Sequence, residues 1–170
     1  MMEAETASAV LPAFPENFCI LALGGNIGDT DALFRRAVQM LGQGGFRVEK
    51  LSSFHRTDPE GCEAGAGTFL NAALSGYWED SPLALLDLCQ SIEAANGRPL
   101  LHPHWHSRTL DIDLILFGRE KMKTPRLTLP HPLAGRRSFV LLPLREICPA
   151  AAEYLKRIAD EEDRLGKSFL

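Results

Sequence analysis

The segment SPLALLDLCQSIEAANG, residues 81–97, carries the clearest structural signals in the chain. Ser81 is a favoured N-cap, Pro82 suits the first helical position, and Gly97 follows the last turn. Its apolar positions repeat at helical spacing, at Leu85, Leu88, Cys89 and Ile92. Its polar positions lie three apart, at Asp87, Gln90 and Glu93. The segment therefore predicts a helix with one apolar stripe and one polar face.

Predicted strands lie on both sides of this helix, FLNAALSGYW at 69–78 and LDIDLILF at 110–117. Upstream, the apolar run 18–24 predicts a strand. A helix should follow, capped by Asp29 or Thr30 and ending near Gly42, and residues 46–56 predict another strand. The resulting order is β-α-β-β-α-β. That order is typical of a ferredoxin-like α+β sandwich with a mainly antiparallel sheet. The apolar stretch after Pro132 and a charged helical tail are C-terminal additions to it.

Length and composition indicate an ordinary globular chain. With 170 residues, 45% of them hydrophobic and 24% charged, we expect a flexible leader at 1–16 and a single domain at 17–170. No apolar run approaches the roughly 20 residues that cross a bilayer, and the leader lacks the features of a signal peptide. We therefore expect a soluble cytoplasmic protein, with its four cysteines as reduced thiols.

Charge is distributed unevenly along the chain. The net charge of −4 makes nucleic acid and membrane unfavoured partners. Residues 98–137 contain eight basic and three acidic side chains, so they carry +5 and the remainder carries −9. A basic cluster in an acidic protein suits a polyanionic small ligand such as a nucleotide, although a solvated basic face explains the charge equally well.

The sharpest local feature is Asp111-Ile112-Asp113. Because side chains alternate along a strand, both carboxylates should leave one face, with Cα atoms roughly 6.5–7 Å apart. The opposite face should then be apolar, with Leu110, Ile112, Leu114 and Leu116. Two carboxylates so placed can hold Mg²⁺, and Arg108 is near enough in sequence to contact a phosphate. The alternative is an edge strand with a solvated polar face.

Two further groups suggest ligands. Phe69 and Asn71 share a strand face, so an aromatic plane lies beside an amide, which suits a flat heterocycle with polar edges or simply an ordinary core. Three histidines alternate through a loop at His102, His104 and His106. They could bind a transition metal, but the prolines at 99 and 103 oppose the regular strand that would align them. Trp105 in the same loop could stack on a base.

Taken in order, several short motifs resemble the 6-hydroxymethyl-7,8-dihydropterin pyrophosphokinases of folate biosynthesis. The matching pieces are LGGNIGD (23–29), SSFHRTDP (52–59), FLNAA (69–73), IE with GR (92–93 and 97–98), HWHSRTLDIDLILFG (104–118), RLTLPHP (126–132) and RRSFVLLPL (136–144). The resemblance extends from about Ile20 to Pro149. It implies transfer of pyrophosphate from ATP, the co-substrate, to the pterin hydroxymethyl group, with release of AMP.

The resemblance also implies roles for individual residues. Asp111 and Asp113 would hold two Mg²⁺ ions that bridge the ATP phosphates, and Arg98 and Arg108 would be catalytic. The residues implied to surround ATP are Gln90, Glu93, His104, Trp105, Arg126, His131 and Arg137. Those implied to bind the pterin are Thr57, Asp58, Glu60, Phe69, Asn71 and Phe139. The expected partners are these two small molecules, for a monomer that binds neither nucleic acid nor membrane.

Some positions depart from the pattern of that family. Gly25 stands where Ser is common, Phe69 where Tyr is common, and Pro132 where an aromatic is often found. Leu100 and His104 occupy loop positions that are often basic, and His106 replaces a small residue. A non-catalytic pterin- or nucleotide-binding protein is the main alternative. The intact Asp111 and Asp113 pair argues against it, because simple binding does not need two metal ions.

Overall fold

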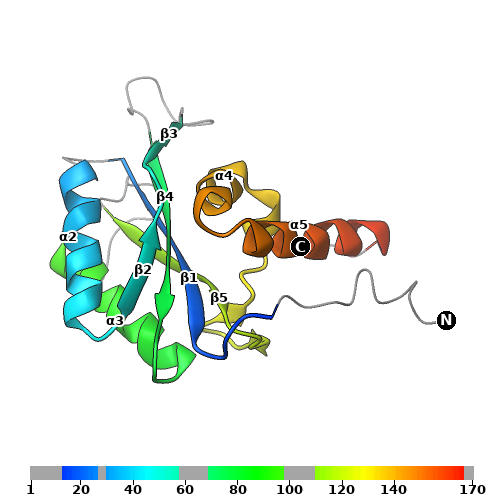
Figure 1. The fold of residues 1–170 in the computed structure, drawn as a ribbon, viewed down its shortest axis with the longest axis horizontal. Helices are drawn as coiled ribbons and strands as arrows, with labels where there is room; N and C mark the ends of the chain where they lie inside the picture. The colour runs from blue at the N-terminus through cyan, green and yellow to red at the C-terminus, as the bar shows by residue number, and fades with distance from the viewer. Residues whose placement is uncertain (1–12, 27–29, 58–68, 98–109, 167–170) are drawn as a thin grey trace.

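A five-stranded antiparallel sheet forms the centre of the computed structural model, which describes residues 13–26, 30–57, 69–97 and 110–166 (Figure 1). Its strands are β1 (Phe18–Gly25), β2 (Arg47–Leu51), β3 (His55–Thr57), β4 (Phe69–Tyr77) and β5 (Asp111–Phe117). The order is β2-β4-β1-β5, and β3 pairs with the other end of β4. This order confirms the predicted ferredoxin-like α+β fold.

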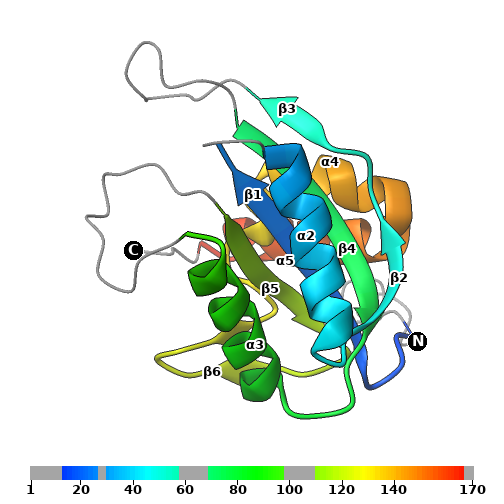
Figure 2. The ribbon, with the colours of Figure 1, turned by 90° about the vertical axis from the view of Figure 1, so that its left-hand side faces the viewer.

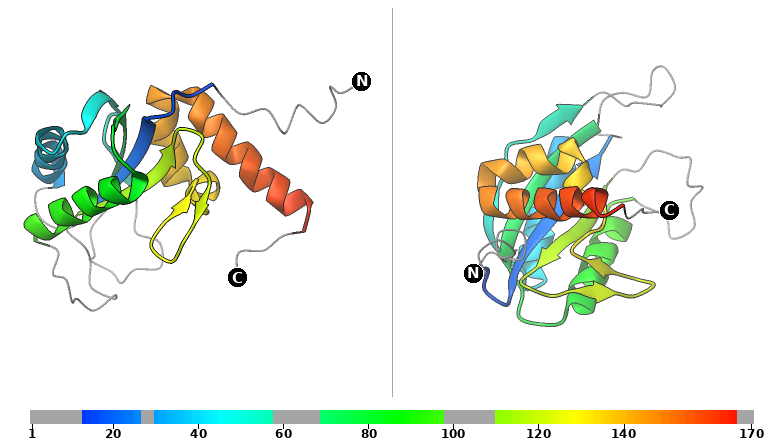
Figure 3. Two further views of the ribbon diagram at one scale, coloured as in Figure 1. Left: turned by 90° about the horizontal axis from the view of Figure 1, so that it is seen from below. Right: turned by 90° about the vertical axis from the view of Figure 1, so that its right-hand side faces the viewer.

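Helices cover both faces of the sheet. Helices α2 (Thr30–Gln43) and α3 (Pro82–Ala95) lie on one face, and α4 (Ser138–Ile147) and α5 (Pro149–Arg164) lie on the other (Figure 2). The right-hand view of Figure 3 shows α4 and α5 side by side across their face. A hairpin of β6 (Met122–Lys123) and β7 (Thr128–Leu129) and the short helix η1 (Ala134–Arg136) connect β5 to α4. Two apolar cores result, one on each side of the sheet.

The helix ends follow the sequence signals. The hydroxyl of Ser81 accepts a hydrogen bond from the Ala84 N–H at 3.1 Å, and Pro82 begins α3. Gly45 has a φ of 106°, and the next N–H, of Phe46, donates to the Leu41 carbonyl at 2.9 Å. That bond closes α2 in the way typical of a glycine at this position. The predicted caps of α3 and the glycine stop of α2 are therefore confirmed.

The predicted strand 46–56 is not continuous, and that prediction was wrong. At Ser52 the backbone N–H donates to the Ala73 carbonyl, while the side-chain hydroxyl accepts from the Ala73 N–H, each at 2.9 Å. A hydroxyl thus takes the place of a backbone carbonyl, so the regular ladder stops there. The chain pairs with β4 again only at β3.

A β-bulge divides β5 into two parts. Ile20 of β1 pairs with Leu116, whereas Leu21 pairs with Leu114, so Ile115 is the extra residue. Leu114 packs in the core beneath α2 and α3, but Leu116 packs in the core beneath α4 and α5. The prediction that Leu116 shares a face with Leu114 was therefore wrong, because one extra residue reverses the alternation.

The start of the described chain also packs on the fold. The ring of Phe14 stacks on Phe18 at 5.2 Å between centroids and meets Tyr154 of α5 edge-on at 6.4 Å. Packing therefore begins before the predicted domain start at residue 17, and residues 1–12 of the predicted leader lie outside the described residues. In the part of the chain that the structure describes, no helix has the length and apolar character needed to span a bilayer.

Candidate active site

One row of neighbouring residues crosses the sheet on the face that carries α4. His55 of β3 pairs with Asn71 of β4, Asn71 pairs with Gly24 of β1, and Gly24 pairs with Asp111 of β5. Paired residues in antiparallel strands present their side chains to the same face. Asp113 lies in the next row, opposite Ala22. The register therefore places polar groups at both ends of a strip whose centre has only small side chains.

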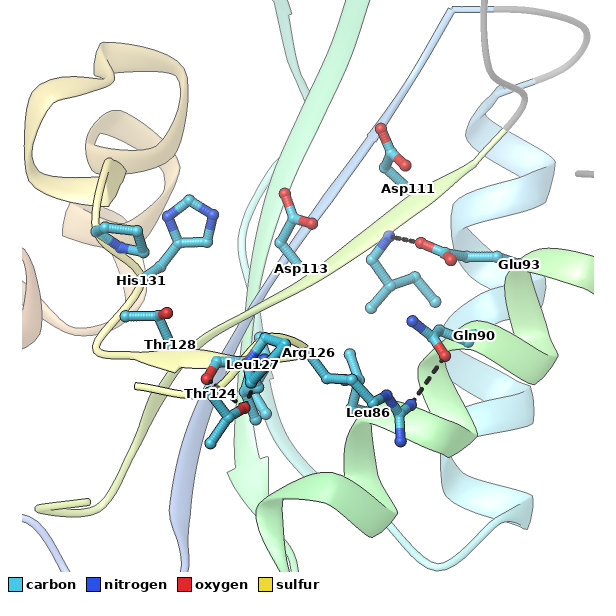
Figure 4. A pocket seen from close by; sticks show the side chains of 14 residues that line it. Leu86, Gln90, Glu93, Asp111, Asp113, Thr124, Arg126, Leu127, Thr128 and His131 are labelled. Carbon is cyan, nitrogen blue, oxygen red and sulfur yellow. Dashed lines mark hydrogen bonds between the residues drawn. The ribbon is translucent and has the colours of Figure 1, made fainter. Parts of the chain in front are cut away.

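A cleft of about 350 Å³ opens at the β5 end of this strip. Figure 4 shows the carboxylates of Asp111 and Asp113 leaving β5 in the same direction. Asp111 is half-buried and Asp113 is exposed. The described lining residues are supplied by α3, by β5 and by the chain from Thr124 to Pro132. The shared orientation that the strand alternation predicts for the two carboxylates is therefore confirmed.

Glu93 fixes the backbone between these two carboxylates. It is only 8% exposed, and its Oε2 accepts a hydrogen bond from the Ile112 N–H at 2.7 Å (Figure 4). Asp87 and Gln90 are exposed, as the predicted polar face of α3 requires, but Glu93 is not, so that part of the prediction was wrong. The backbone N–H of Ile112 explains the burial, because it gives the carboxylate a charge-assisted partner.

Negative charge is concentrated around this cleft. Burial raises the pKa of the neighbouring Cys89 thiol to about 12, and the charges of Glu93 and Asp113 add to the rise. Three carboxylates around one cleft favour a bound cation. Within the described ranges, no three or more His, Cys, Asp or Glu side chains gather as a metal cage. Mg²⁺ does not require one, because it usually binds one or two carboxylates together with water and substrate phosphates.

His131 stands beside Asp113 and is fixed by its own backbone. Its N–H donates to the carbonyl of the bulged residue Ile115 at 2.8 Å, and its Nδ1 accepts from the Leu133 N–H at 3.1 Å. Burial lowers the pKa of His131, while the charge of Asp113 opposes this and that of Arg137 adds to it. A neutral His131 therefore carries its proton on Nε2, where it can be donated to a ligand.

Arginines occupy two borders of the site. Arg126, between β6 and β7, donates to Gln90 Oε1 at 3.1 Å (Figure 4) and to Asp87 Oδ1 at 2.7 Å, which ties the hairpin to α3. Arg137 precedes α4, and its guanidinium lies 5.6 Å from the ring centre of Phe139. Phe139 is 42% exposed, which is unusual for so large an apolar side chain in this chain.

The predicted pterin residues of β3 and β4 lie at the other end of the strip. Asn71 is 8% exposed, and its Nδ2 donates to Thr57 Oγ1 at 3.2 Å. Thr57 pairs with Phe69, which is half-buried. An amide, a hydroxyl and an aromatic ring therefore gather within one corner of the sheet.

A cluster that the sequence did not reveal borders this corner. Glu146 of α4 accepts hydrogen bonds from the Ser53 N–H at 2.9 Å and from the Ser53 hydroxyl, and it also pairs with His55 Nε2. The Ser53 N–H and hydroxyl, and then His55, lower the pKa of this carboxyl. Glu146 thus ties α4 to the connection between β2 and β3. Its only sequence signal is a single acidic residue, beside Arg145, at the end of a helix that is otherwise mostly apolar.

Comparison with known proteins supplies the family. The sequence model of 7,8-dihydro-6-hydroxymethylpterin-pyrophosphokinase (HPPK) matches residues 20–149. The chain belongs to this family. A 2-amino-4-hydroxy-6-hydroxymethyldihydropteridine pyrophosphokinase of Bacillus subtilis is 44% identical over 133 residues, which are 78% of each chain. The enzyme of that name from Methylorubrum extorquens is 42% identical, over 76% of this chain and 81% of its own length.

Solved structures show the same HPPK fold. A structure described as HPPK-DHPS in complex with substrates matches 89% of this chain with a TM-score of 0.62 and 13% identity. A Plasmodium falciparum HPPK-DHPS with pteroate also has a TM-score of 0.62, at 14% identity. This chain spans 45% of the length of each of those two chains.

The HPPK resemblance predicted from the motifs is therefore confirmed, and the non-catalytic alternative is not favoured. The structure gathers six predicted residues around one cleft: Gln90, Glu93, Asp111, Asp113, Arg126 and His131. Their roles toward ligands stay predictions, as do those of Thr57, Phe69, Asn71, Arg137 and Phe139. Six more lie outside the described residues: Asp58, Glu60, Arg98, His104, Trp105 and Arg108. The histidine loop of the transition-metal alternative lies there too.

Proposed function

We infer that this chain transfers the pyrophosphoryl group of ATP to the hydroxymethyl group of 6-hydroxymethyl-7,8-dihydropterin and releases AMP, as a step of folate biosynthesis. Family membership and the relatives named pyrophosphokinase support this reaction. One structural observation carries it. Asp111 and Asp113 leave the same face of β5 beside a cleft, and Asp111 is in register with Asn71 two strands away.

Asp111 and Asp113 are the residues that would hold two Mg²⁺ ions. Both are accessible carboxylates, and Glu93 fixes the backbone between them through Ile112. When bound, the ions neutralise negative charge on the polyphosphate. Carboxylate oxygens suit Mg²⁺ better than they suit softer transition metals, so the carboxylate pair fits this ion.

The surrounding side chains suit the nucleotide. Arg126 and Gln90 are already joined by a hydrogen bond at the α3 side of the cleft, where a base or ribose can meet both. On the opposite side His131 lies near Asp113 and Arg137 lies near His131, so the Nε2–H and the guanidinium can donate to phosphate oxygens. Arg98, Arg108, His104 and Trp105 complete the proposed nucleotide site from outside the described residues.

The corner of the sheet around Asn71 suits the pterin. The amide of Asn71 offers both a donor and an acceptor, as the polar edge of a pterin ring requires. Phe69 and the exposed ring of Phe139 would lie against the two faces of the ring. Thr57, at the end of β3, and Asp58 and Glu60 after it would contribute further polar contacts.

The reaction needs alignment more than covalent help from the protein. The hydroxymethyl oxygen forms a bond to the β-phosphorus, the bond from that phosphorus to the oxygen of the α-phosphate breaks, and the hydroxyl proton is released. AMP leaves with the bridging oxygen. Positioning of the two substrates and stabilisation of phosphate charge by Arg137 and His131 supply the chain's contribution.

Production of AMP from ATP and the pterin alcohol tests this proposal. Activity should require added Mg²⁺, and Asp111→Asn or Asp113→Asn should lower kcat by at least about a hundredfold. Asp160→Asn, an exposed carboxylate of α5 paired with Lys156, is the matched control and should be fully active. Binding of both substrates without AMP formation would contradict the proposed reaction.

We further propose that the enzyme acts as a monomer in the cytoplasm and that residues 17–170 form one domain, against which Phe14 also packs. The chain buries apolar cores on both faces of its sheet, so it needs no partner to complete them. Sedimentation of the purified protein measures the first point. A dimer at micromolar concentration would contradict it.

A further inference from the structure

Gly24 occupies the centre of the strip between the proposed pterin corner and the proposed metal site. It pairs with Asn71 on one side and with Asp111 on the other, and it is half-exposed on the face that both side chains share. Adjacent strands lie about 4.8 Å apart, so Asn71 and Asp111 are separated by roughly 10 Å across β1. Any group that connects the two must pass above Gly24.

Packing does not require a glycine at this position. A Cβ added to Gly24 would lie 3.5 Å from Asn71 Oδ1 and 4.0 Å from the Leu70 carbonyl, which are ordinary contacts, and its φ is outside the left-handed region. Gly76 of β4 is different, because a Cβ there would lie 2.4 Å from the Arg47 carbonyl and 2.5 Å from the Phe46 ring. The fold explains the glycine at 76 but not the glycine at 24.

A glycine inside a strand has a cost that the fold must bear. It loses more conformational freedom on folding than alanine does, and β-branched residues favour strands. Such a residue at a half-exposed position often marks a close approach of a ligand to the backbone. Gly24 lies between Asn71, proposed to bind the pterin, and Asp111, proposed to bind the metal. The ligand that approaches it is therefore the part of the pterin that reaches toward the phosphates.

We infer that Gly24 is the floor of a passage through which the hydroxymethyl arm of the pterin reaches the phosphates, and that its missing side chain determines which arms fit. This inference rests on the proposed function. The ring would lie at Asn71, and only the reacting carbon and oxygen would lie above β1. Gly24 is thus a specificity-determining residue that acts through the space it leaves.

Substitution at position 24 tests the passage. Gly24→Ala should lower kcat/KM for the pterin alcohol about tenfold, and Gly24→Val about a hundredfold, because a methyl group displaces the reacting oxygen. The affinity for a non-hydrolysable ATP analogue should change less than about threefold. The free energy of unfolding of Gly24→Ala in urea should stay equal or rise, since the added Cβ makes only ordinary contacts.

A second ligand distinguishes an effect on the hydroxymethyl arm from an effect on the ring slot, the proposed site of the pterin ring at Asn71. With the ATP analogue present, calorimetry should show that Gly24→Val binds the pterin alcohol at least about tenfold more weakly than the parent protein. A pterin that lacks the hydroxymethyl group should bind both proteins equally. Gly42→Ala, in α2 with nothing within 4 Å of the added Cβ, is the control for a general glycine effect and should change neither ligand's affinity.

The outcomes distinguish this inference from the proposed function. If Gly24→Val keeps full kcat/KM while Asp111→Asn is inactive, the passage is wrong and the reaction stands. Equal loss of affinity for both pterins would place Gly24 in the ring slot and would also overturn the passage. If Asp111→Asn and Asp113→Asn retain full activity, the proposed site itself fails.

Discussion

Replacing Glu93 with alanine should weaken both the fold and the catalytic site. The carboxylate of Glu93 is buried and accepts a hydrogen bond from the Ile112 N–H at 2.7 Å. That N–H lies between Asp111 and Asp113, so its partner determines how rigidly the two carboxylates are presented. The alanine variant leaves the N–H without this acceptor in a buried place.

The expected cost can be worked from the hydrogen bond. A bond to a charged group contributes about 1.5–3 kcal/mol, and loss of one partner leaves a desolvated donor that costs a similar amount. The two costs describe partly the same loss and therefore do not add in full. The free energy of unfolding of Glu93→Ala should fall by about 2–4 kcal/mol. Each kcal/mol lowers the Tm of a chain this long by about 2–4 °C, which gives a fall of roughly 5–15 °C.

Glu93→Gln separates the acceptor from the charge. Glutamine keeps an oxygen for the Ile112 N–H, so its free energy of unfolding should fall by only about 1 kcal/mol. Urea denaturation gives the stabilities, and AMP production gives the rates. We expect kcat to fall at least about tenfold in Glu93→Ala, because Asp111 and Asp113 lose their alignment.

Unchanged stability of Glu93→Ala would refute this reasoning, since the Ile112 N–H would then have another adequate partner. A second result is informative about the ligand. If Glu93→Gln is as stable as the parent protein but inactive, the negative charge of Glu93 acts on the nucleotide or its cation.

Three further predictions follow from the same contacts. Asn71→Ala should weaken binding of the pterin by about 1–3 kcal/mol, or roughly 5- to 150-fold, and leave ATP affinity unchanged, as calorimetry can measure. Arg126→Ala should raise KM for ATP several-fold while KM for the pterin stays constant, because Arg126 lies on the α3 side of the cleft. Glu146→Gln should be less stable than the parent at neutral pH. Because the folded pKa of Glu146 is lowered, that difference should begin to shrink below the ordinary value of 4.5 and disappear as the pH falls through the lowered folded pKa, which a series of urea titrations from pH 7 downward measures.

Local signals in the sequence predicted most of the architecture. Ser81, Pro82 and Gly97 define both ends of α3 because capping and left-handed backbone depend on only a few neighbouring residues. The shared orientation of Asp111 and Asp113 follows from the alternation of a strand. Their spacing made Mg²⁺ binding one of two open interpretations, whereas the two-ion role and the joint role of Phe69 and Phe139 at the pterin came from the resemblance to a family.

Features that depend on distant partners could not be predicted in this way. Ser52 interrupts a strand because its hydroxyl meets the backbone of Ala73, and Glu93 is buried because Ile112 offers an N–H. Glu146 reaches Ser53, which is 93 residues away in sequence. In each case the decisive partner belongs to another element, and no pattern within the segment indicates it.

The bulge at Ile115 makes the length of β5 as important as its composition. On the face that carries α4 and α5, the strand presents the two carboxylates before the bulge and Leu116, packed in the core, after it. If Ile115 were deleted while the second half stayed packed, Asp111 and Asp113 would turn into the apolar layer beneath α2 and α3. This position should therefore accept a change of side chain far more readily than the loss or gain of one residue. A sequence alignment that places a gap there would assign Asp111 and Asp113 to the wrong face of the sheet.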